Sequence, residues 1–177
     1  MPTHISLLRG INVGGNKKIH MAELKTLYES LGLRAVTTYV QSGNVVFDVD
    51  SADASALIAR IEAAIAERFG FDVTVLLRSA DDLRCILDGN PFPGVEATKL
   101  HVLFLAATPD PVAAQTLTVP VVDGEDWRLT GQEIYLHYPN GSGRSKMTSA
   151  FFERALGLAA SARNWNSVNA LYDLTRR

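Results

Sequence analysis

The sequence has one cysteine, Cys85, among its 177 residues, and it can therefore form no internal disulfide. Disulfides are rare in the reducing cytosol and common outside it, so this composition favours a cytoplasmic location. No run of apolar residues approaches the roughly 20 that a membrane-spanning helix requires, and the beginning lacks the apolar stretch and cleavage site of a secretory signal. We therefore expect a cytoplasmic protein with no membrane partner.

An excess of positive charge is also missing, because 17 basic residues stand against 19 acidic ones and the net charge is −2. Proteins that bind the DNA backbone usually carry a basic excess, since the neutralisation of phosphates drives that binding. Any nucleic-acid site in this chain would therefore be a local patch of positive side chains.

Metal-binding patterns are absent as well. The four histidines are scattered and show no spacing typical of zinc ligands. The segment DVDSADAS carries three aspartates, but it lacks the glycine and the terminal glutamate of a calcium loop. We expect Ser51 or Asp53 to cap the following helix instead, and we expect no metal site.

Apolar patterns predict six elements in the first 78 residues. Strands are expected at HISLL, AVTTYV, NVVFDV and DVTVLL, which are apolar or rich in β-branched residues. Helices are expected at 21–31 and 53–69, where apolar residues recur at helical spacing and a glycine follows. The order β-α-β-β-α-β is that of the ferredoxin-like fold.

The second half repeats this pattern in a looser form. The loop NPFPG is a plausible boundary, and it is followed by a strand at KLHVLFLA, a helix near 111–117, and strands at DWRLTG and EIYLHY. Two helices, 146–156 and 164–174, are predicted to end the chain. The sequence thus predicts an α+β protein with a ferredoxin-like subdomain at 1–78 and a β-α-β-β-α-α variant at 79–177.

Three blocks carry a family resemblance that covers nearly the whole chain: LLRGINVGG, YVQSGNVVF and SARNWNSV. Together they resemble an uncharacterised bacterial family, domain of unknown function 1697. The resemblance implies an α+β fold of two subdomains with the first ferredoxin-like. It implies no activity, and no catalytic residue is carried over from it.

The loop RGINVGGNKKIH separates the first strand from the first helix. It fails as a nucleotide-hydrolase phosphate loop, because Asn16 stands where the motif requires lysine, and it fails as a dinucleotide fingerprint, because Asn12 replaces the second glycine. Basic side chains before a helix N-terminus still suit an anion. The backbone freedom of glycine accounts for much of the same pattern without a ligand, and both interpretations stay open.

The turn QSG between the second and third strands also allows two interpretations. Glycine and asparagine tolerate the backbone angles of a tight turn, which explains Gly43 and Asn44 without a function. As a functional element, the same turn would present Gln41 and Asn44 at one end of the sheet.

Basic residues also precede helices predicted in the second half, where a cation opposes the helix dipole. Arg144 and Lys146 lie before and at the start of the helix predicted at 146–156, and Arg163 precedes the last helix. Such placements suggest a shared negative partner. This partner could be the acidic segment that holds Asp123, Glu125 and Asp126, or it could be a phosphorylated ligand.

The leading hypothesis is a protein that binds an anionic small molecule or a nucleic-acid segment. An enzyme with Asp126 or Glu153 as general base is an alternative, and so is a module that self-associates through open sheet edges. No cofactor follows from the sequence, and both a monomer and a homodimer are compatible with it. The predicted ligand-binding residues are Arg9, Asn12, Gly14, Lys17, Lys18, Arg144, Lys146, Arg163 and Asn164.

Overall fold

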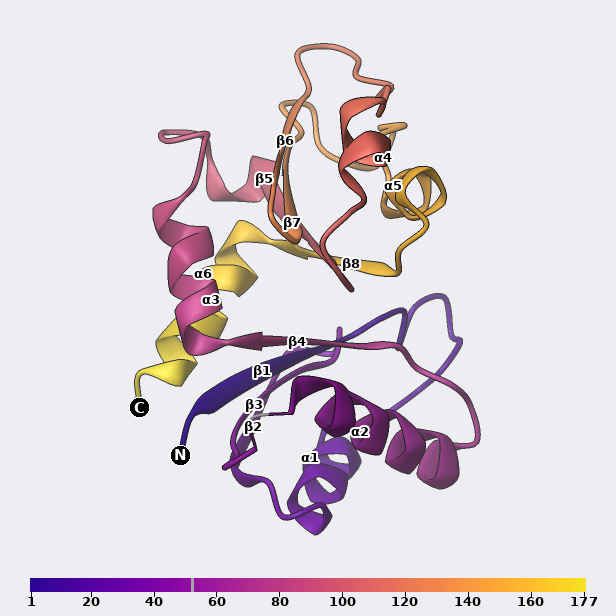
Figure 1. Ribbon diagram of the computed structural model, residues 1–177, viewed down its shortest axis with the longest axis vertical. Coiled ribbons are helices and arrows are strands. Elements are labelled where there is room, and N and C mark those ends of the chain that lie inside the picture. The colour runs from indigo at the N-terminus through magenta and orange to yellow at the C-terminus, as the bar shows by residue number, and fades with distance from the viewer. Residues whose placement is uncertain (52) are drawn as a thin grey trace. The chain divides into compact units, whose positions relative to one another are not determined.

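The structure, a computed structural model, describes residues 1–51 and 53–177 (Figure 1). The chain divides into two compact units, one formed by Met1–Arg84 with Leu171–Arg177 and the other by Cys85–Ala170. The predicted limits of the two domains, 1–78 and 79–177, stay a prediction.

The first unit contains the six predicted elements in the predicted order. They are β1 (Thr3–Leu8), α1 (Met21–Ser30), β2 (Arg34–Tyr39), β3 (Asn44–Asp48), α2 (Ala54–Phe69) and β4 (Val75–Ser79), and α3 (Ala80–Asp88) follows. The strands form an antiparallel sheet in the order β2-β3-β1-β4. This arrangement confirms the ferredoxin-like fold of the first unit.

Helices α1 and α2 cover one face of this sheet, and the core of the unit lies between the two layers (Figure 1). Leu24 and Tyr28 from α1, and Ile61 and Ile65 from α2, are buried there against the sheet. The helical spacing that predicted these helices is the spacing that brings their apolar residues onto one face. Asp53 caps α2 as expected, since its Oδ1 accepts a hydrogen bond of 2.9 Å from the backbone N–H of Ala56.

The second unit follows the same plan with one more strand than the sequence predicted. Its elements are η1 (Ala97–Lys99), β5 (Leu100–Leu105), α4 (Pro111–Gln115), β6 (Asp126–Thr130), β7 (Glu133–His137), α5 (Ser149–Leu156) and β8 (Ala160–Asn164). Helix α6 (Trp165–Thr175) begins in this unit and ends in the residues assigned to the first. The sheet order is β6-β7-β5-β8. The unit is therefore a second ferredoxin-like subdomain, and the predicted β-α-β-β-α-α order lacked β8.

The two sheets share a detail of register that shows how closely the second unit repeats the first. In β1, His4 pairs with Ser79 and Ile5 pairs with Arg78 of β4. In β5, His101 pairs with Asn164 and Val102 pairs with Arg163 of β8. Each last strand thus carries an arginine followed by the residue that precedes a helix.

None of the helices in the described part of the chain combines the length and apolar character that crossing a bilayer would demand. Residues 1–51 and 53–177 also contain no group of three or more histidine, cysteine or acidic side chains arranged to hold a metal ion.

Candidate functional site

The loop between β1 and α1 is a small hairpin with unusual backbone angles. Gly14 and Gly15 form its turn with positive φ values of 59° and 78°, and Asn12 and Lys17 flank it with φ values of 55° and 49°. The backbone N–H of Asn16 donates to the carbonyl of Val13 at 3.0 Å, and that of Asn12 donates to the carbonyl of Lys17 at 3.1 Å. Paired positive φ values are typical of two-residue hairpin turns, which explains the adjacent glycines.

The side chain of Asn12 closes the base of this hairpin. Its Oδ1 accepts a hydrogen bond of 2.9 Å from the N–H of Ile19, and its Nδ2 donates to the carbonyls of Ile19 at 3.1 Å and Gln41 at 2.7 Å. Asparagine also tolerates positive φ better than most residues. The predicted ligand residue Asn12 therefore shapes the loop and joins it to the β2–β3 turn.

Two neighbouring loops hold the hairpin in place at this end of the sheet. The backbone N–H of Leu8 donates to the carbonyl of Gly43 at 2.8 Å, and that of Arg9 donates to the carbonyl of Thr74 at 2.9 Å. The Lys17 ammonium donates to the carbonyl of Asp72 at 2.7 Å. Lys17, predicted to meet a ligand, thus fastens the hairpin to the loop between α2 and β4.

A pocket of about 350 Å³ lies beside the hairpin. Its lining consists of Asn12, Gly15, Lys18, Ile19, His20 and Gln41. Among the described residues, the exposed Lys18 ammonium forms no ion pair or hydrogen bond. His20 is the N-cap residue of α1 and its side chain caps none of the described backbone N–H groups, so first-turn amides remain available beside the pocket.

This pocket includes some of the predicted residues and adds others. Asn12 and Lys18 line it, while Gly15 takes the place predicted for the adjacent Gly14. The sequence did not identify His20, whose position just before a helix was the available signal. Of the two side chains expected at the turn, Gln41 lines the pocket, whereas Asn44 is buried and donates to the Tyr39 carbonyl at 2.9 Å.

The predicted residues of the second unit occupy separate environments. Arg144 lines a pocket that contains neither Arg163 nor Asn164, and Lys146 is exposed. The Asn164 Oδ1 accepts a hydrogen bond of 2.8 Å from the N–H of Ser167, which caps the start of α6. The pocket that Arg144 lines also lacks Lys146, and whether these residues share a ligand with one another or with the hairpin of the first unit stays a prediction.

Arg163 is the most buried of the predicted basic residues, with 6 % of its surface exposed. Its Nη1 donates to the Ser161 hydroxyl at 2.6 Å and to the Ala162 carbonyl at 2.9 Å. Removal from water disfavours the charged guanidinium and lowers the Arg163 pKa to about 10. These two contacts tie the Arg163 side chain to its own strand.

The two carboxylates considered as general bases lie on different elements. Asp126, at the start of β6, accepts hydrogen bonds at its Oδ1 from the N–H of Trp127 at 2.8 Å and from Arg128 at 2.6 Å. Glu153 lies on α5. The Asp126 carboxylate is therefore paired with the Arg128 guanidinium of the same strand.

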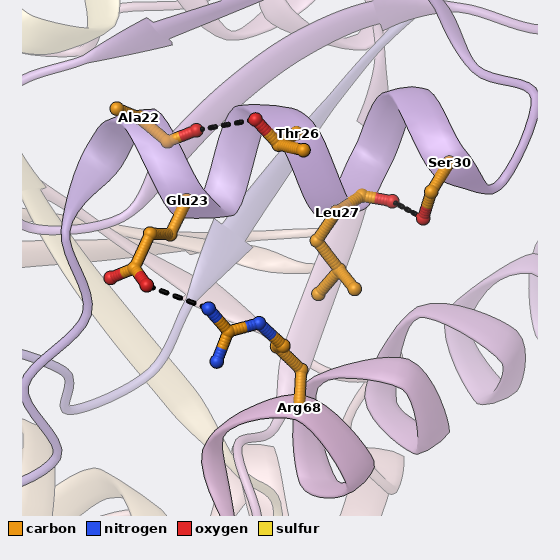
Figure 2. A pocket seen from close by; sticks show the side chains of 6 residues that line it. All are labelled: Ala22, Glu23, Thr26, Leu27, Ser30 and Arg68. Atoms are coloured by element: carbon orange, nitrogen blue, oxygen red, sulfur yellow. Dashed lines mark hydrogen bonds and ion pairs between the residues drawn. The ribbon is translucent and has the colours of Figure 1, made fainter.

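A further groove runs between α1 and α2, and Figure 2 shows the ion pair that crosses it. The Arg68 Nη2 lies 2.7 Å from the Glu23 Oε1, while Thr26 and Ser30 each donate to a carbonyl of their own helix. The guanidinium is thus neutralised by its own protein. This groove therefore offers less unpaired positive charge than the pocket beside Lys18.

The Arg68–Glu23 pair gives a first prediction. We expect Arg68→Ala to lower the free energy of unfolding by less than about 1 kcal/mol, because exposed ion pairs gain little over their hydrated charges. Both side chains are about half exposed, at 55 % and 41 %. Urea unfolding followed by circular dichroism measures the change, and a loss several times larger would show that the pair organises the two helices.

The comparisons with known proteins agree with this fold. Residues 1–135 match a family described as "Protein of unknown function (DUF1697)". A solved structure, that of the conserved bacterial protein SP0830 from Streptococcus pneumoniae, is similar with a TM-score of 0.73 and 24 % identity, and the match covers 98 % of each chain. The comparison with curated proteins gives no match.

Proposed function

The chain belongs to the DUF1697 family of proteins of unknown function, and on that premise we propose that it binds a phosphorylated small molecule in the pocket beside the β1–α1 hairpin. The match confirms the resemblance seen in the sequence, and it assigns no activity. The proposal therefore depends on the chemistry of the pocket alone.

The observation that carries the proposal is the position of the Lys18 ammonium at a pocket that also adjoins the N-terminus of α1. A lysine that pairs with no described group is available to a phosphate oxygen, and charge-assisted hydrogen bonds are the stronger kind. Backbone N–H groups at a helix start, and amides beside consecutive positive-φ residues, add fixed partial positive charge. Both sources of positive potential adjoin the same pocket.

The pocket also favours a small molecule over a long polymer. Its volume of about 350 Å³ lies near the lower end of the range for small-molecule sites. The hairpin is held by Asn12 and Lys17 before any ligand arrives, which reduces the entropy lost on binding. A compact phosphorylated metabolite is therefore the ligand class that we propose.

Self-association through an open sheet edge, the alternative module, has less support. The edge strand β2 shifts register between Arg34 and Thr37, and Ala35 there has a positive φ of 50°. Bulges and charged residues at an edge are features by which proteins avoid edge-to-edge pairing.

We expect phosphorylated compounds to raise the melting temperature, and we expect Lys18→Ala to weaken their binding by about 10-fold to 100-fold, the equivalent of one charge-assisted hydrogen bond. The matched control is Lys25→Ala, which removes an exposed lysine on α1 that pairs with Glu29. Thermal shift with a panel of sugar phosphates and nucleotides, followed by calorimetry on the hits, measures both effects.

The proposal fails if no phosphorylated compound in the panel binds the wild-type protein. It also fails if Lys18→Ala and Lys25→Ala bind the hits equally well, because the pocket beside Lys18 would then not be the site.

A further inference from the structure

A second pocket, of about 360 Å³, lies within the second unit and is independent of the hairpin. Two loops form it, one leading into β6 and the other following β7. The lining residues are Val122, Asp123, Glu125, Asn140, Gly141, Arg144 and Ser145. Both signs of charge are therefore present around one cavity.

These charges do not neutralise one another. Within residues 1–51 and 53–177, neither the Arg144 guanidinium nor the Asp123 carboxylate takes part in an ion pair or a hydrogen bond. Glu125 uses one oxygen, Oε1, which accepts from the N–H of Val122 at 3.0 Å. The pocket thus presents an available cation and available carboxylate oxygens.

The acidic wall is a tight turn. The N–H of Glu125 donates to the carbonyl of Val122 at 3.0 Å, and Asp123 and Gly124 between them have positive φ values of 49° and 82°. Asp123 is one of the few residues other than glycine that accept such angles. The turn fixes the backbone from which the two carboxylate side chains extend.

The wall that carries Arg144 is anchored as well. The buried Tyr138 donates from its hydroxyl to the carbonyl of Met147 at 2.6 Å, and the N–H of Gly141 donates to the carbonyl of Tyr138 at 3.0 Å. Asn140 reaches across to the acidic turn, where its Nδ2 donates to the carbonyl of Asp123 at 3.4 Å. Both walls are therefore held without a ligand.

We propose that this pocket binds a free amino acid or a similar small zwitterion. Arginine binds a carboxylate through two parallel N–H groups, so Arg144 would take the ligand's carboxylate. Asp123 and Glu125 would take its ammonium group. A ligand of a single charge meets repulsion from one wall, whereas a zwitterion satisfies both, and this difference is what selects it.

The test compares free amino acids with derivatives that lack one charge. We expect at least one free L-amino acid to bind the wild-type protein in calorimetry, and its N-acetyl derivative and its carboxamide each to bind at least 10-fold more weakly. Arg144→Gln and Asp123→Asn should each weaken binding of the free amino acid by at least 10-fold. Asparagine tolerates positive φ, so the second variant keeps the turn.

Matched controls are Arg154→Gln on α5 and Asp88→Asn at the end of α3, both exposed residues outside the pocket. They should bind the amino acid as the wild type does. The proposal is overturned if no amino acid binds, if the blocked derivatives bind as tightly as the free form, or if the pocket variants match the controls. Circular dichroism confirms that each variant is folded.

Discussion

Replacing Gly43 with alanine is expected to lower the free energy of unfolding by about 2–5 kcal/mol. The residue has a φ of 85°, a left-handed conformation that costs an alanine roughly 1–2 kcal/mol. A Cβ added there would lie 2.7 Å from the Ile11 Cδ1 and 2.8 Å from the Leu8 Cβ. The Ile11 end can rotate, but the Leu8 Cβ is fixed on the backbone of β1, so overpacking adds about 1–3 kcal/mol.

A second glycine separates the two contributions to that loss. Gly70 has nearly the same φ, 80°, but no described atom beyond Gly70 and its two neighbours in the chain lies within 4 Å of where its Cβ would be. Gly70→Ala should therefore cost only the conformational part, about 1–2 kcal/mol. Urea unfolding followed by circular dichroism compares the two variants. Equal losses would show that the loop from Leu8 to Ile11 moves away from the turn at no cost.

Because Gly43 supports the loop that leads into the hairpin, its replacement also bears on the proposed phosphate pocket. The Leu8 N–H bonds to the Gly43 carbonyl, and Gln41 in the same turn accepts from Asn12. Any shift of this turn displaces the base of the hairpin. The sequence identified the glycine as a turn residue, but only the packing shows why no larger residue fits.

Most helices were predictable because their apolar residues recur at the period of a helix, and most strands because their segments are rich in strand-forming residues. Strand β8 is the exception. Its sequence, ASARN, contains no β-branched or aromatic residue, and alanine has low strand propensity. It is a strand because it pairs with β5 along its whole length, from Ala160 to Asn164. Tertiary pairing of this kind leaves no local signal in the sequence.

The candidate site was predictable in part for a similar reason. The sequence located the basic, glycine-containing loop and its neighbouring helix, and Asn12 and Lys18 do line a pocket there. It did not show that Lys17 is used to fasten the hairpin, because its partner, Asp72, is distant in the sequence. The acidic turn at Asp123 was one of two partners that the sequence allowed for the basic residues, the other being a phosphorylated ligand, and no described ion pair joins it to Arg144.

Alkaline pH is expected to destabilise the protein steeply between about pH 10 and pH 12, because three tyrosines are buried. Burial disfavours the phenolate, which raises the pKa of Tyr135 to about 12 and raises the pKa values of Tyr28 and Tyr138 well above the ordinary value of 10.0. Each hydroxyl has a hydrogen-bond partner: Tyr28 bonds to Ser6, Tyr135 to the Ile86 carbonyl and Tyr138 to the Met147 carbonyl.

The sign follows from which state holds the proton. A folded-state pKa above the unfolded value gives stability that is fully present below about pH 10 and is lost as the pH rises through the folded pKa. For Tyr135 the difference of about two pKa units corresponds to roughly 3 kcal/mol. Between the unfolded-state pKa and the folded-state pKa, the ionisation of each tyrosine lowers the free energy of unfolding by up to about 1.4 kcal/mol per pH unit. The three tyrosines together therefore produce a steep decline in stability.

Unfolding in urea at a series of pH values from about 8 to 12 measures this slope. Absorbance at the phenolate band reports the ionisation of the tyrosines directly. Tyr135→Phe serves as the matched variant. It should be about 1–3 kcal/mol less stable at neutral pH, because the Ile86 carbonyl loses its donor. Its decline with pH should be shallower than that of the wild type, since one ionisable group has been removed. Identical slopes in the two proteins would show that Tyr135 ionises without unfolding.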